Sequence, residues 1–241
     1  MLKKNNKNYH HGDLKAALIA AGLAEIEEKG LESLSLRSIA ARVGVSHTAP
    51  KNHFDGLRGL LTAIATVGFE RHAAEMRKDV DDQPPGKARL EAAGKGCLRF
   101  AMQHAELFKL MFSSALCDAD DPQLKQAAWG SYDVLRGIAH GLDWDKADAP
   151  GSPWRTEWML WSMVHGYAML VIEGQVPCND DGTPMFDMDA LMPNFAYKPD
   201  GFKTRPKPFT GRPLRGRRRP PNPRSPCSHG DEAGEVDGGA R

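Results

Sequence analysis

The sequence predicts an all-α fold with two helical parts and a disordered C-terminal tail. Apolar residues recur at steps of three and four over most of residues 13–173, as on one face of a helix. A glycine-containing run near residue 44 has the pattern of a tight turn between two short helices. After residue 176, prolines, glycines and charged residues replace the periodic apolar pattern. We therefore expect the folded part to end near residue 176.

The most informative stretch is residues 35–54, SLRSIAARVGVSHTAPKNHF. Ser35 can cap a first helix, because its hydroxyl can accept from a free backbone N–H, and Ser46 can cap a second helix over residues 46–53. Gly44 lies between them, where glycine adopts positive φ without steric cost. The first helix has the apolar face Leu36, Ile39, Ala40 and Val43. This order is typical of a helix-turn-helix, whose second helix enters the major groove of DNA, although a helical hairpin in a protein core is an alternative.

The second helix would present hydrogen-bonding side chains to DNA. Thr48 and Asn52 suit base edges or phosphates, and Ser46 could bind a phosphate at the helix start. Pro50 is tolerated because it falls in the first helical turn. The net charge of only +1 does not exclude DNA binding, since the local charge of the binding face decides it. The candidate DNA-binding residues are Ser35, Arg37, Ser46, His47, Thr48, Ala49, Lys51, Asn52 and His53.

The run LSLRSIAARVGVSHTAPKNHF resembles the DNA-binding domain of TetR-family transcriptional regulators, in the branch with a WHG-type C-terminal domain. The motif WSMVHG at residues 161–166 supports this resemblance. It implies a three-helix DNA-binding domain over residues 13–56 and a helical ligand-binding and dimerisation domain over residues 57–176. Two departures bear on DNA affinity and operator sequence. Lys51 stands where this branch usually has tyrosine, and Leu57 stands where it has a DNA-contacting lysine.

The same resemblance implies a ligand-responsive repressor that binds a palindromic double-stranded DNA operator as a homodimer. The last two helices, about residues 123–142 and 154–173, would pair with their copies in the dimer. A small-molecule effector would enter the helical bundle. Candidate pocket residues, which could instead form the dimer interface or plain core, are Phe100, Leu107, Met111, Trp129, Trp158, Trp161, His165 and Met169. The alternative function is a helical adaptor or ligand-binding protein that lacks specific DNA binding.

No sequence pattern of an enzyme or a metal site is present. The chain has no glycine-rich phosphate loop, nucleophile elbow or HExxH motif, so we predict no catalytic residues and no cofactor. Its four cysteines are scattered without the spacing of a zinc site. It also lacks a signal peptide and any run approaching about 20 apolar residues. These features predict a cytoplasmic protein with no membrane partner. The TetR resemblance implies a bacterial protein that is nucleoid-associated when bound to DNA.

The two ends of the chain are polar and basic. Residues 1–12 are expected to be a flexible arm that contacts phosphate or the minor groove, or else a solvated tail. Residues 177–241 are expected to be disordered, because they hold too few large apolar residues to offset the entropy of ordering. Between Lys203 and Arg224 there are many Arg and Lys and no acid. Such a tail would add nonspecific, salt-sensitive DNA affinity, or it is a dispensable extension.

Overall fold

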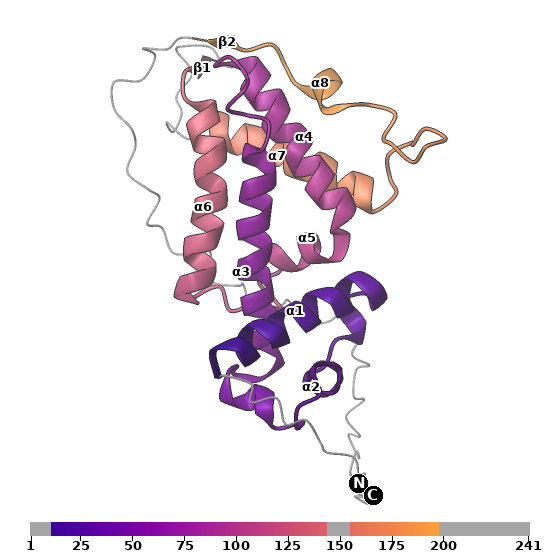
Figure 1. The fold of residues 1–241 in the computed structure, drawn as a ribbon. Helices are drawn as coiled ribbons and strands as arrows, with labels where there is room; N and C mark the ends of the chain where they lie inside the picture. The colour runs from indigo at the N-terminus through magenta and orange to yellow at the C-terminus, as the bar shows by residue number, and fades with distance from the viewer. Residues whose placement is uncertain (1–10, 144–154, 198–241) are drawn as a thin grey trace, which may run out of the picture. The chain divides into compact units, whose positions relative to one another are not determined.

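A computed structural model describes residues 11–143 and 155–197, and these residues form an all-α fold as predicted (Figure 1). The chain order is α1 (His11–Lys29), the 3-10 helix η1 (Leu31–Ser33), α2 (Leu36–Val43), the 3-10 helix η2 (Ala49–Asn52), α3 (Gly56–Arg77), α4 (Lys87–Gln103), α5 (Ala105–Met111), α6 (Pro122–Ala139), β1 (Leu142–Asp143), α7 (Arg155–Ile172), α8 (Met188–Leu191) and β2 (Ala196–Tyr197). The two short strands pair antiparallel, with Leu142 opposite Tyr197. Residues 1–10 of the predicted arm and residues 198–241 of the predicted tail lie outside the described residues.

The first half of the helix-turn-helix is confirmed in detail. The Ser35 hydroxyl accepts from the Ser38 backbone N–H at 3.0 Å, and the Ser38 hydroxyl lies 3.1 Å from the Ser35 backbone N–H, which forms a reciprocal capping box. Gly44 ends α2 at φ 78°, in the left-handed region that favours glycine. Ile39 and Ala40 form the buried face of α2, where it packs on α1. Thus the local sequence determines where α2 begins and ends.

The predicted helix over residues 46–53 is wrong in type and length. Only Ala49–Asn52 is helical, and it is a single 3-10 turn. The backbone N–H groups of Ala49, Lys51 and His53 bond three residues back at 3.0–3.1 Å, as in a 3-10 helix. Pro50 has no N–H, so it cannot donate the α-helical bond to residue 46. The Ser46 hydroxyl lies 2.9 Å from the Thr48 hydroxyl, and no side-chain cap bonds the start of η2.

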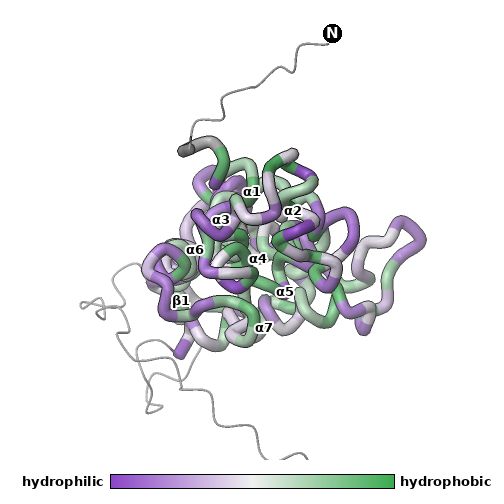
Figure 2. The backbone as a smooth tube through the Cα atoms, turned by 90° about the horizontal axis from the view of Figure 1, so that it is seen from below, coloured by the Kyte–Doolittle hydropathy of each residue, from purple (hydrophilic) through white to green (hydrophobic). Residues whose placement is uncertain are grey.

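The larger part of the core surrounds α3, which runs beside α6 (Figure 1) and also packs on α4 and α5. A bend at His104 separates α4 from α5. Gly96 on α4 lies against the backbone of α3, because a Cβ added there would lie 2.5 Å from the Glu75 carbonyl oxygen. Hydrophobic stretches gather toward the middle of the described fold, and hydrophilic stretches follow its outer turns (Figure 2). None of the described helices is both long and apolar enough to span a membrane.

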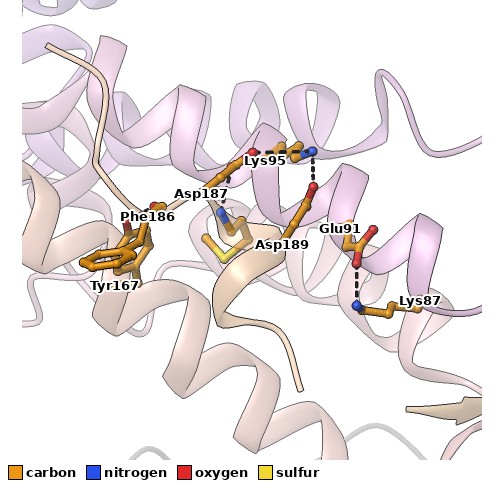
Figure 3. A network of polar contacts seen from close by, with 8 residues as sticks. Lys87, Glu91, Lys95, Tyr167, Phe186, Asp187 and Asp189 are labelled. Carbon is orange, nitrogen blue, oxygen red and sulfur yellow. Dashed lines mark hydrogen bonds and ion pairs between the residues drawn. The ribbon is translucent and has the colours of Figure 1, made fainter. Parts of the chain in front are cut away.

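Residues 177–197, which we call the strap, correct the prediction of disorder from residue 177 onward. Met188 is fully buried and lies against Gly94 of α4, and Met192 is also buried. Lys95 of α4 binds Asp189 at 2.6 Å and Asp187 at 3.6 Å, while the Tyr167 hydroxyl of α7 donates to the Phe186 carbonyl oxygen (Figure 3). Average composition predicted disorder here because the turns around these few buried or ion-paired residues are polar and rich in proline. The strap therefore belongs to the fold.

Candidate DNA-binding segment and ligand cavity

The candidate DNA-binding residues fall into two groups by exposure. Ser35, Arg37, Ser46, His47, Thr48, Lys51 and Asn52 are exposed, whereas Ala49 and His53 are half-buried. Pro50 and Phe54 are buried and attach the segment to the core. The Ser35 hydroxyl is occupied as a helix cap, so its contribution to DNA contact would be indirect. The segment from residue 46 to 52 thus presents a row of hydrogen-bonding side chains on a buried anchor.

An exposed ion pair joins α1 to α2. Arg42 Nη1 donates to Glu28 Oε2 at 2.7 Å, and Arg42 Nη2 donates to the other oxygen of the same carboxylate. This hydrogen bond lowers the pKa of Glu28 and raises that of Arg42. The sequence analysis did not identify the pair, because its members lie 14 residues apart on different helices.

A cavity of about 150 Å³ lies between α3, α4, α6 and α7 and the residues of α5 and its C-terminal end. Its wall is mostly aromatic and aliphatic. The lining residues are Phe69, His72, Met76, Leu90, Ala93, Gly94, Cys97, Phe108, Phe112, Ala128, Ser131, Tyr132, Leu135, Leu160, Trp161, Val164 and His165. A concave, mostly apolar space with a few polar groups is the usual form of a small-molecule site.

Of the eight predicted pocket residues, only Trp161 and His165 line this cavity. Phe100, Leu107 and Met111 are core residues, and Met169 packs against the core. Trp129 and Trp158 are exposed, at 38% and 51% of their surface. The sequence analysis missed most of the wall, including Phe69, His72, Phe108, Phe112 and Tyr132. Helical periodicity identifies an apolar face, but it does not tell which neighbouring helix covers that face.

His72 is the main polar group in the cavity wall. Its Nδ1 lies 2.8 Å from the Ser131 hydroxyl, and its Nε2 lies 3.2 Å from the Cys97 sulfur. Both ring nitrogens are therefore engaged within the protein. Burial disfavours the charged imidazolium and lowers the pKa of His72 to about 4, with a further contribution from His165. Burial likewise raises the pKa of the Cys97 thiol to about 12, so the pair is a neutral thiol and a neutral imidazole.

His165 lies among aromatic rings at the same cavity. It stacks on Phe108 with ring centroids 5.2 Å apart. It also packs edge-to-face with Phe112, with ring centroids 4.3 Å apart. Its Nδ1 is buried, and no residue in the described part of the chain forms a hydrogen bond with it. Burial lowers the pKa of His165 as well. The neighbouring Tyr132 hydroxyl donates to Glu157, and burial with this bond raises the pKa of Tyr132. The polar groups of the wall are thus uncharged at neutral pH.

The depressed pKa of His72 predicts a pH-dependent stability. An unfolded chain binds this proton near pH 6.5, but the folded chain binds it only near pH 4. The contribution of neutral His72 to the free energy of unfolding is therefore complete above pH 6.5. It is lost as the pH falls toward 4, and the total loss is about 3 kcal/mol. We expect urea denaturation of the wild type to show this loss between pH 7 and 4, and the His72→Gln variant to lack it. Parallel pH curves for the two proteins would contradict the assignment.

Among the residues that the structure describes, no cluster of three or more His, Cys, Asp or Glu side chains could hold a metal ion.

Comparisons with known proteins point to one family. The family model described as "Tetracyclin repressor-like, C-terminal domain" matches residues 90–191, a range that includes most of the strap. The tetracycline repressor protein class G of Vibrio anguillarum is 36% identical over 69 residues, which are 28% of this chain and 33% of that protein. The match thus spans about a third of this curated relative.

Solved structures extend the likeness over most of the chain. A protein of unknown function from Rhodococcus sp. RHA1 is 30% identical with a TM-score of 0.59, covering 77% of this chain and 93% of its own. A TetR family transcription regulator from Marinobacter aquaeolei VT8 shares the fold at 15% identity and a TM-score of 0.51, over 69% of this chain and 87% of its own. These matches do not single out the WHG-type branch, which stays a prediction. With its capped, glycine-ended α2 and a tetracycline repressor-like match over residues 90–191, the chain is similar to TetR-family transcriptional regulators.

Proposed function

We propose that this protein is a transcriptional repressor that binds an operator through residues 35–53 and loses DNA affinity when a small molecule occupies the cavity. The observation that carries the proposal is the exposed row from Ser46 to Asn52, held by the buried Pro50 and Phe54. Exposed hydroxyl, amide, imidazole and ammonium groups in one short segment suit base edges and phosphates. We assign no catalytic activity to the chain. It would act in the bacterial cytoplasm, where it meets chromosomal DNA.

A homodimer would give the two reading segments that a palindromic operator needs. Three large apolar side chains on α6 and α7 support this arrangement: Trp129, Trp158 and Leu170 are each 38–51% exposed. Tryptophan is enriched at the centres of protein interfaces, since it buries a large area with few torsions. We therefore place the dimer interface on α6 and α7, as the sequence resemblance implies.

Two sets of contacts could carry a change at the cavity to the DNA-binding helices. His104 Nδ1 lies 2.9 Å from Glu27 Oε1 of α1, and the His104 ring lies 5.1 Å from Phe100. Phe100 in turn lies 5.2 Å from the His72 ring in the cavity wall. A chain of packed side chains of this kind can transmit a shift if it has two discrete arrangements.

The second set lies at the start of α3. Arg58 Nη2 donates to the Cys117 carbonyl oxygen at 2.8 Å, and the Asp118 backbone N–H donates to the Thr62 hydroxyl at 2.8 Å. Both bonds join the N-terminal turns of α3 to the loop between α5 and α6. A ligand that moves α5 relative to α3 would therefore act directly on the helix that follows the recognition segment.

Substitution of the exposed recognition residues tests the proposal. The double variant Thr48→Ala with Asn52→Ala should bind a selected operator at least about 30-fold more weakly, because each lost base contact removes about 1–3 kcal/mol of discrimination. The operator would be selected from a random DNA pool with the wild-type full chain, and affinities would be measured by fluorescence anisotropy. Gln103→Ala, at an exposed position on α4, is the control. Equal operator affinity for the double variant and the control would contradict the assignment of Thr48 and Asn52. A selection that yields no preferred DNA would favour the adaptor alternative.

A further inference from the structure

The size, rings and charge of the cavity together limit the molecule that it can hold. We propose that the effector is an uncharged, compact molecule built on one aromatic ring or a fused pair of rings, with about six to ten non-hydrogen atoms. Its role as an effector rests on the function proposed above, but its binding to the cavity can be tested separately.

The volume of the cavity limits the size of the ligand that it can hold. The cavity measures about 150 Å³. An engineered apolar cavity of roughly this volume in another protein binds benzene. Enlarging the space would require close-packed wall residues to move, among them Phe108 and Leu160, which are fully buried. Overpacking a core in this way costs about 1–3 kcal/mol or more. A single ring with a small substituent therefore fills the space, whereas a linear three-ring system would have to displace wall residues or leave part of its surface outside.

The wall favours a ring-shaped ligand. Phe69, Phe108, Phe112, Trp161 and His165 supply aromatic surface from three different helices and the end of α5. Aromatic rings attract one another in edge-to-face and offset stacked arrangements, beyond the effect of the area that they bury. The wall already shows such geometry between Phe112 and His165, at 67° between ring planes. A ligand ring would extend this set of contacts.

Charge is excluded because the wall has no group to balance it. The lining contains no Asp, Glu, Lys or Arg. A cationic ligand would find no carboxylate in the wall, and a cation–π contact of about 2 kcal/mol, even with a neutral hydroxyl or imidazole acceptor, does not offset burial of a charge. An anionic ligand would need a protonated histidine, yet burial lowers the pKa of both His72 and His165. His72 also has both ring nitrogens engaged by Ser131 and Cys97.

A matched set of probes tests the proposal on the wild-type full chain without DNA. Benzyl alcohol, benzoate and benzylammonium share one ring and differ in charge at pH 7.5, and acridine is an uncharged three-ring probe. Titration calorimetry should show benzyl alcohol binding at least ~10-fold more tightly than either charged probe and than acridine. Equal or tighter binding of a charged probe or of acridine would overturn the proposal. So would the absence of binding by benzyl alcohol.

Filling the cavity shows where the probe binds. Ala128→Leu adds bulk to the cavity wall on α6, and Ala74→Leu makes the same change at an exposed position of α3 outside the cavity. We expect the first variant to bind benzyl alcohol at least ~10-fold more weakly and the second to bind it like the wild type. Val164→Leu, which adds one methylene to the wall, replaces Ala128→Leu if that variant does not fold. Unchanged binding in a folded cavity-filled variant would place the ligand elsewhere and overturn the inference.

DNA measurements separate this inference from the proposed function. If benzyl alcohol binds the cavity but leaves operator affinity unchanged, the ligand class stands and the proposed ligand response fails. If the protein binds its operator but no uncharged single-ring probe binds the cavity, the ligand inference fails and the DNA-binding function stands.

Discussion

Replacing Met188 by alanine is expected to lower the free energy of unfolding by about 2–5 kcal/mol, the usual range when a buried methionine is truncated. Met188 is fully buried and lies against Gly94, so closely that a Cβ on that glycine would come within 2.8 Å of it. The strap around it is also fixed by Lys95, which binds Asp189 and Asp187. Urea denaturation followed by circular dichroism of the helices measures the effect.

Met185 provides a matched control in the same strap. It is 54% exposed, so Met185→Ala should change the stability by less than about 0.5 kcal/mol. Similar results for the two variants would mean that the strap does not unfold together with the helical core. The same reasoning predicts that a chain ending at Gly174 is destabilised, because it lacks every strap contact to α4.

The Gly96→Ala substitution is expected to lower the free energy of unfolding by about 1–3 kcal/mol or more, because the new methyl group would collide with the backbone of α3. The added Cβ would lie 2.5 Å from the Glu75 carbonyl oxygen and 3.0 Å from Met76 Cα, both on α3. A flexible side chain could turn away from such a contact, but helix backbone cannot. The two helices would have to separate, and this would disturb the cavity that lies between them. Denaturation of the variant and its affinity for benzyl alcohol would both report the change.

Gly137→Ala on α6 is the control for the intrinsic effect of the substitution. Nothing lies within 4 Å of an added Cβ at Gly137. Alanine is a better helix former than glycine, so this substitution should raise the free energy of unfolding by about 0.5–1 kcal/mol. A Gly96→Ala variant as stable as Gly137→Ala would show that α3 and α4 are not in close contact at this point.

Local patterns in the sequence predicted much of the fold. Ser35 and Gly44 determine the two ends of α2 through a capping box and a left-handed turn, and both features depend only on neighbouring residues. The predicted helices over residues 123–142 and 154–173 correspond to α6 and α7. The TetR resemblance read from residues 34–54 agrees with the later comparisons.

Features that depend on distant residues were predicted less well. The cavity wall combines Phe69 and His72 of α3 with Ser131 of α6 and His165 of α7, and no periodicity within one helix reveals this combination. Met188 anchors the strap as a single buried side chain within a polar stretch, so average composition predicted disorder there. The prediction of an α-helix over residues 46–53 was wrong for a local reason, because Pro50 lacks the N–H group that an α-helix needs.

Sequence-specific DNA binding is the central claim, and fluorescence anisotropy tests it most directly. The full chain and a chain ending at Arg205 would be titrated with DNA from upstream of the protein's own gene and with a scrambled control, at two salt concentrations. We predict that both chains prefer the native DNA by at least ~100-fold, with the basic tail adding only affinity that salt removes. Equal binding of both DNAs by the full chain, with a steep salt dependence that disappears in the shorter chain, would contradict the claim. The DNA affinity would then belong to the arginine-rich tail.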